Sequence, residues 1–83
     1  MNNLITVEVV CPALSRSYDF MMPPALGFGV LKEHIIEDIR IYEDIPLLFE
    51  NGDVMLFFAG KYLSDDKKPN DVGLKNGDRI YIL

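Results

Sequence analysis

The segment from Gly27 to Glu43, with the sequence GFGVLKEHIIEDIRIYE, separates two groups of strand-like segments and has a helical repeat. Its apolar side chains follow one another at spacings of three, four, four and three residues, at Phe28, Leu31, Ile35, Ile39 and Tyr42. This spacing places them on one face of an amphipathic helix. The segment lacks a Ser, Thr, Asp or Asn cap, and Glu43 and Asp44 at its end oppose the helix dipole. We therefore expect one helix that depends on packing against a sheet more than on its own propensity.

Two segments before this helix alternate between apolar and polar residues, as half-buried strands do. They run from Leu4 to Val10 and from Arg16 to Met22. The residues between them include Pro12, which cannot donate a hydrogen bond to a strand ladder, so the chain is expected to turn there. In this interpretation Cys11 is a small apolar loop residue. Two strands so close in sequence predict an antiparallel hairpin.

The segments after the helix predict a second group of strands. They are Val54 to Ala59, the short Tyr62 to Leu63, and Asp78 to Leu83, with a polar loop from Ser64 to Asn70. Asn51-Gly52 is typical of a two-residue hairpin turn, so Leu47 to Glu50 either pairs with the next strand or packs as a loop. The order of elements requires a mixed sheet of four or five strands with one helix across one face, and the last strand parallel to the first. The expected class is therefore α+β, with the β-grasp arrangement.

Length and charge restrict the type of protein. With 83 residues, of which 49% are hydrophobic, residues 1–83 are expected to form one domain with its own core. A net charge of −5 disfavours nucleic acid and anionic membrane surfaces as partners. No apolar run is long enough to insert into a bilayer, and a single cysteine cannot form an internal disulfide, so a cytoplasmic protein is expected.

The carboxyl half carries a family resemblance. The stretch from Leu56 to Leu63, LFFAGKYL, resembles the second half of ubiquitin. The ending from Asn70 to Leu83, NDVGLKNGDRIYIL, resembles still more closely the small bacterial ubiquitin-like proteins called YukD or EsaB. Members of that family are encoded with type VII secretion systems of Gram-positive bacteria. The resemblance implies a single ubiquitin-like domain that acts as an accessory or regulatory component of such a system and binds another component or regulator of it.

The end of the sequence bears on the chemistry that is expected. Ubiquitin and the related sulfur carriers act through a flexible tail that ends in Gly-Gly, whereas this sequence ends at Leu83, within a predicted strand. We therefore expect neither conjugation nor thiocarboxylate chemistry, although a divergent carrier or modifier protein remains an alternative.

Residues for catalysis or metal binding are few. Cys11 and His34 are single residues of their kinds, and the predicted elements do not bring them together, so the protein is not expected to be an enzyme. Asp65, Asp66 and Asp71 do not have the spacing of a calcium loop. We expect no cofactor and no metal, and interpret these three carboxylates as part of a solvated loop.

The strand from Val54 to Phe58 is apolar at every position, which a sheet covered by one helix does not require. If Leu56 and Phe58 point toward the helix, Met55 and Phe57 must point away from it. The same parity in the last strand sends Tyr81 and Leu83 outward. A partner-binding surface is therefore predicted at Met55, Phe57, Tyr81 and Leu83.

The resemblance supports this site, because Phe57, Tyr81 and Leu83 match positions of the hydrophobic patch on ubiquitin. Two alternatives remain open. Leu47 to Phe49 could cover Phe57 within the chain. A second copy could also cover it, which would make the protein a self-associating structural module that forms a weak homodimer.

Overall fold

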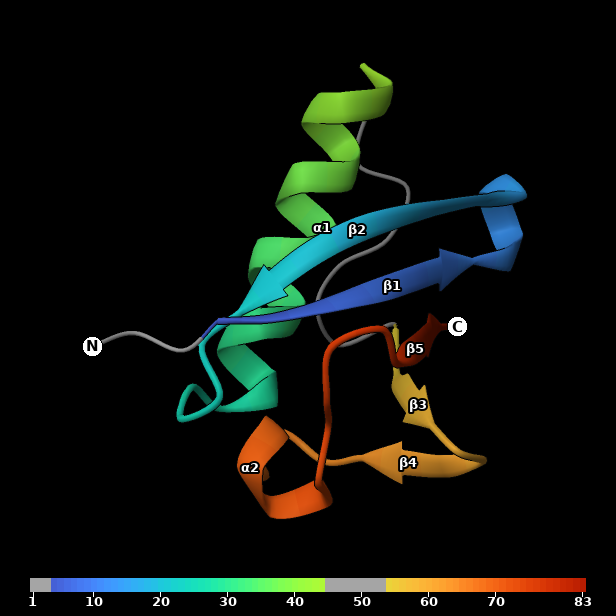
Figure 1. Ribbon diagram of the computed structural model, residues 1–83. Coiled ribbons are helices and arrows are strands. Elements are labelled where there is room, and N and C mark those ends of the chain that lie inside the picture. Colours follow the sequence, from blue (N-terminus) through green and yellow to red (C-terminus); the bar gives the residue numbers. More distant parts are fainter. Residues whose placement is uncertain (1–3, 45–53) are drawn as a thin grey trace.

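One long helix crosses one face of a five-stranded mixed sheet in the computed structural model (Figure 1). The structure describes residues 4–44 and 54–83. The strands are β1 (Ile5–Cys11), β2 (Arg16–Met22), β3 (Leu56–Phe58), β4 (Lys61–Leu63) and β5 (Arg79–Ile82). The helices are the short 3-10 helix η1 (Pro12–Leu14), the long α1 (Phe28–Glu43) and the single turn α2 (Pro69–Val72). This arrangement confirms the expected α+β class and the β-grasp architecture.

The strand order in the sheet is β2-β1-β5-β3-β4. β1 and β2 form the predicted antiparallel hairpin, with Val7 opposite Phe20. β5 lies beside β1 in parallel, with Val9 opposite Ile80, as the order of elements required. β3 is antiparallel to both β5 and β4. The predicted pairing of Leu47 to Glu50 falls outside the described residues.

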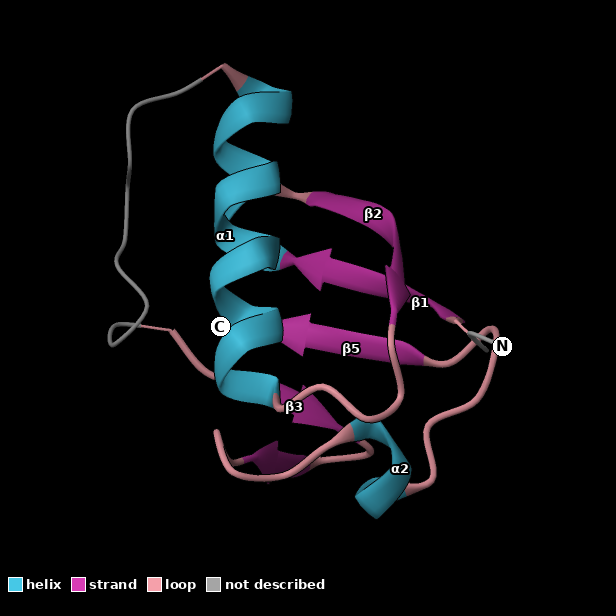
Figure 2. Ribbon diagram, turned by 90° about the vertical axis from the view of Figure 1, so that its left-hand side faces the viewer, coloured by secondary structure: helices cyan, strands magenta, loops and turns pink. Residues whose placement is uncertain are grey.

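The core lies between the sheet and α1, which covers one face (Figure 2). The helix buries the predicted residues Phe28, Leu31, Ile35 and Ile39 against strand residues such as Val9. Tyr42, which was predicted to belong to the same stripe, is instead 78% exposed. Figure 2 shows the reason: the last turns of α1 project beyond β2, where no strand lies beneath them.

The start of α1 is capped by backbone groups that lie far away in sequence. Gly27 has no side chain that could cap the helix. The backbone N–H of Phe28 donates to the carbonyl of Lys67 at 2.8 Å, and that of Gly29 donates to the carbonyl of Asp65 at 3.1 Å. This contact also explains the glycine at position 29, because a Cβ there would lie only 3.1 Å from the Cβ of Asp65. The helix thus needs no local cap, since the loop after β4 satisfies its first donors.

Two local predictions were wrong. Cys11 is the last residue of β1 and is buried at 1% exposure, so it belongs to the core and not to a loop. The polar loop predicted to run to Asn70 ends earlier, because α2 begins at Pro69. Proline suits the first helical position, and the Asp71 carboxylate accepts the backbone N–H of Lys68 at 3.0 Å.

Candidate protein-binding face

A row of side chains crosses the whole sheet on the face opposite α1. Residues that lie directly opposite one another on neighbouring strands share a face of the sheet. The register places the following residues side by side in strand order: Ser17, Val10, Tyr81, Phe57 and Tyr62. The half of this row on β5, β3 and β4 is aromatic.

A second pair of apolar residues lies next to this aromatic half. The backbones of Met55 and Leu83 exchange two hydrogen bonds of 2.9 Å each, which extends the β3–β5 ladder by one residue on each strand. The parity of the strands then puts both side chains on the same face as Phe57 and Tyr81. The structure thus brings together all four predicted site residues.

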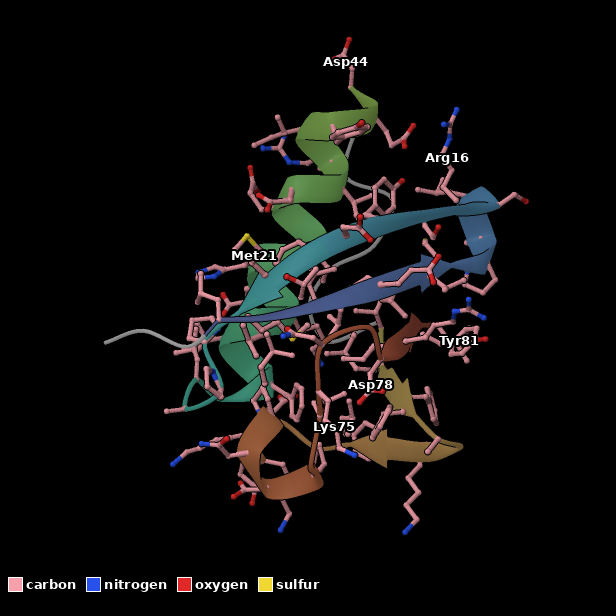
Figure 3. All side chains as sticks on the ribbon, viewed as in Figure 1. Arg16, Met21, Asp44, Lys75, Asp78 and Tyr81 are labelled. Atoms are coloured by element: carbon pink, nitrogen blue, oxygen red, sulfur yellow. The ribbon has the colours of Figure 1, made fainter. Side chains whose placement is uncertain are left out.

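We name this surface the β3–β5 patch, and define it as Met55, Phe57, Tyr62, Tyr81 and Leu83. Four of its side chains are strongly exposed: Tyr81 by 39%, Met55 and Tyr62 by 52%, and Leu83 by 59%. Figure 3 shows Tyr81 pointing outward from the sheet. Phe57 is half-buried, and its ring lies 6.1 Å from that of Tyr62 with the planes tilted by 59°. The segment from Leu47 to Phe49, which could have covered Phe57, lies outside the described residues.

Tyr62 is the member of the patch that the sequence analysis missed. It pairs with Phe57 because β3 and β4 are joined by a two-residue turn at Ala59 and Gly60, both at positive φ. With Phe58 opposite Lys61, position 57 must face position 62. The Ala-Gly turn was the available signal, since a two-residue connection sets the register of a hairpin.

The β1–β2 half of the open face is charged. The Arg79 guanidinium lies 2.8 Å from the Glu8 carboxylate. A hydrogen bond from Ser17, together with this pairing to Arg79, lowers the pKa of Glu8 below its usual value. Across the β1–β2 ladder, however, Glu8 lies directly opposite Asp19, so one cross-strand pair consists of two carboxylates.

Replacing Asp19 with lysine should therefore stabilise the protein. Like charges directly opposite one another weaken a sheet, and a lysine would convert the pair with Glu8 into an attractive one. We expect the midpoint of thermal unfolding to rise by roughly 2 to 4 °C at low salt, and the gain to shrink in 1 M salt. The change Glu33→Lys on the exposed side of α1 alters the net charge equally and is the matched control. An equal rise in both variants would show an effect of net charge alone.

The end of α1 is tied to β2 by a second polar cluster. The Tyr18 hydroxyl donates to the Glu43 carboxylate at 2.6 Å, and the Arg16 guanidinium lies 3.6 Å from the same carboxylate. The Tyr18 ring also meets that of Tyr42 edge to face, with centroids 5.7 Å apart. Burial and the hydrogen bond to Glu43 raise the pKa of Tyr18 to about 12. Glu43, which opposes the helix dipole, is thus used to hold the helix end to the sheet.

This raised pKa predicts a loss of stability in alkaline solution. The unfolded chain releases the Tyr18 proton near pH 10 and the folded chain near pH 12, so the folded state binds more protons between these values. The free energy of unfolding should fall across this window, by at most about 2 to 3 kcal/mol. Denaturant unfolding of the wild type and of Tyr18→Phe, measured from pH 9 to 12, isolates this contribution. Parallel curves for the two proteins would contradict it.

The remaining candidate residues lie apart from one another or have local partners. His34 is on the exposed side of α1, whereas Cys11 is buried under the sheet. Asp65 lies 3.3 Å from the Lys32 amine, and Asp66 accepts the Ser64 hydroxyl at 2.7 Å. Within residues 4–44 and 54–83, no three His, Cys, Asp or Glu side chains gather as a metal site would require. In the same part of the chain, no helix is both long enough and apolar enough to cross a membrane.

Solved structures of known proteins share this architecture. Ubiquitin from Caldiarchaeum subterraneum matches with a TM-score of 0.70 over 96% of this chain and 91% of that chain, at 15% sequence identity. The fold is ubiquitin-like. A ubiquitin-like domain of an Arabidopsis thaliana protein, determined by NMR in solution, matches with a TM-score of 0.68 and 23% identity. That match covers 98% of this chain and 77% of the other.

Sequence comparison adds no closer relative to this ubiquitin-like fold. No family model matches the chain, and no curated protein matches it. The low identities to the solved structures mean that the likeness concerns the backbone arrangement and not the surface. The chemistry of the β3–β5 patch must therefore be argued from this chain's own residues.

Proposed function

We propose that this ubiquitin-like domain is a non-enzymatic module that binds a protein partner through the β3–β5 patch. The observation that carries the proposal is the exposure of five neighbouring apolar or aromatic side chains on one face of a small sheet. A contiguous surface of this kind on a small domain is typical of an interaction site. Single exposed apolar residues elsewhere, such as Val30 on α1, form no comparable group.

The composition of the patch suits a binding surface. Tyr81 and Tyr62 combine large apolar area with a polar hydroxyl, and such residues dominate the binding energy of many interfaces. Charged residues border the patch: Lys61 on β4 and the Glu8–Arg79 pair on β1 and β5. An apolar centre with a charged rim is the usual anatomy of a protein interface. The partner is therefore expected to present an apolar surface of its own.

The finer proposal is that this partner belongs to a type VII secretion system and that the domain acts in the cytoplasm. It is supported by the likeness of residues 70–83 to YukD and EsaB. Part of that ending has a structural use here: the Asn76 side chain accepts the backbone N–H of Thr6 at 2.8 Å, and Asp78 accepts that of Lys75 at 2.8 Å. These contacts place β5 beside β1, and so place Tyr81 and Leu83 on the open face.

Affinity capture from the native cytoplasm tests both levels of the proposal. The wild-type domain should enrich a type VII secretion component, and the Phe57→Ser variant should capture at least about tenfold less of it. Because Phe57 is half-buried, the more exposed Tyr81→Ser serves as a second variant, and circular dichroism checks the fold of both. Val30→Ser, at an exposed apolar position on α1, is the matched control.

The possible outcomes separate the patch from its assignment. Equal capture by folded Phe57→Ser and Tyr81→Ser would remove the patch from the argument. Patch-dependent capture of proteins unrelated to secretion would remove the secretion role but keep the binding face. Sedimentation that shows dimers abolished by Tyr81→Ser would identify the partner as a second copy of the chain.

A further inference from the structure

A second surface with the features of a binding site lies at the edge of the sheet, apart from the β3–β5 patch. β2 is an edge strand, with β1 on one side and no strand on the other within the described residues. A groove of about 630 Å³ runs between β2 and the second half of α1. Figure 2 shows how it arises: the last turns of α1 extend past β2 and form a ledge beside the strand.

From this geometry we propose that the groove binds an extended peptide with alternating apolar and basic residues, which adds to the sheet as a sixth strand beside β2. The unpaired backbone groups of an edge strand are a template for such pairing. β2 offers seven residues, from Arg16 to Met22, whereas the opposite edge, β4, offers three. A peptide of five to seven residues therefore finds a full ladder only at β2.

The ledge explains why alternate residues of the peptide must be apolar. A strand added about 4.8 Å from β2 would lie over the projecting end of α1. Two large apolar residues are exposed there, Ile41 by 63% and Tyr42 by 78%, and both line the groove. Side chains of the peptide that point toward α1 would cover them, as the strands of the sheet cover Ile35 and Ile39.

Charge explains why the other residues of the peptide must be basic. The groove is lined by three carboxylates, on Asp19, Asp38 and Glu43, and by one cation, Arg16. Glu43 is held by Tyr18 and Arg16, whereas no ion pair involves Asp19 or Asp38 within residues 4–44 and 54–83. Asp19 also lies opposite Glu8, a like-charge pair that a cation on an added strand would relieve.

The same charge argues against a second copy of this chain as the occupant. Asp19 is the middle residue of β2, so a symmetric antiparallel pairing centred on the strand brings the two Asp19 side chains together. Each copy also has a net charge of −5. A charge in the middle of an edge strand is a known device against self-pairing.

Two synthetic peptides test the proposal, one with alternating Val and Lys and one with alternating Val and Glu. The lysine peptide should bind and shift the amide NMR signals of residues 16–22 and of the end of α1. Asp19→Lys should weaken its binding roughly fivefold to tenfold, and should strengthen binding of the glutamate peptide. Glu33→Lys, which changes the net charge equally but lies outside the groove, should alter either affinity less than about twofold.

Two further arms test the ladder and the ledge. Methylating alternate backbone nitrogens of the lysine peptide, on the edge that faces β2, removes donors but keeps the side chains, and should abolish binding. Tyr42→Ala should weaken binding about threefold or more, since it removes exposed ring surface from the ledge.

Three results would overturn the proposal. They are equal affinities for Asp19→Lys and Glu33→Lys, unchanged binding of the methylated peptide, and signal shifts confined to Phe57 and Tyr81 on the open face. Concentration-dependent shifts of residues 16–22 without peptide would instead show that a second copy occupies the edge.

Discussion

Replacing Phe28 with alanine should lower the free energy of unfolding by about 3 to 5 kcal/mol. The Phe28 side chain is fully buried at the first turn of α1, between the sheet and the loop that caps the helix. The helix has no side-chain cap, so it depends on this packing and on the carbonyls of Lys67 and Asp65. Small domains have only about 5 to 15 kcal/mol of stability, so much of it would be lost.

Urea unfolding followed by circular dichroism measures this loss. Val30→Ala is the matched control, because Val30 lies two residues further along the same helix and is 42% exposed. Its effect should stay within about 0.5 kcal/mol, since surface substitutions rarely exceed that. A loss below about 1 kcal/mol in Phe28→Ala would mean that the start of α1 is not packed as the structure has it.

Lys32 is the second residue with a large expected effect. Its side chain is 7% exposed, and its amine donates to the carbonyl of Val54 at 3.2 Å and lies 3.3 Å from the Asp65 carboxylate. Replacing it with alanine removes the packed stem and leaves the Val54 carbonyl without this donor. We expect a loss of about 2 to 4 kcal/mol in the free energy of unfolding.

Lys32→Met separates the contribution of the stem from that of the charge. Methionine keeps most of the apolar volume but has no ammonium group, and burying a charge offsets much of what an ion pair contributes. We therefore expect this variant to differ from the wild type by about 1 kcal/mol or less. Equal losses in the alanine and methionine variants would show that the charge, and not the packing, accounts for the effect.

The role of Lys32 connects the core with the binding face. Val54 immediately precedes Met55, which pairs with Leu83 at the border of the β3–β5 patch. Loss of the Lys32 contact should therefore loosen the start of β3. Faster amide exchange at Met55 in Lys32→Ala, but not at Val9 in the centre of the sheet, would show this directly.

Much of the fold followed from periodicity. Alternation in residues 4–22 predicted the β1–β2 hairpin, and the three-and-four spacing from Phe28 to Ile39 predicted α1. Parity also predicted the outward positions of Met55, Tyr81 and Leu83, because side-chain direction in a strand is a local property. The predictions were wrong at Tyr42 and Cys11, where burial depends on how far the sheet and the helix extend and not on the local pattern.

The sequence by itself thus determined which segments are strands or helix, and which side of each strand is apolar, since both are set by local backbone geometry. Only the tertiary structure decided three other features: the capping of α1 by the carbonyls of Asp65 and Lys67, the burial of Lys32, and the ledge of α1 beyond β2. Each depends on contacts or lengths of elements that are distant in sequence, so no local pattern of residues encodes it.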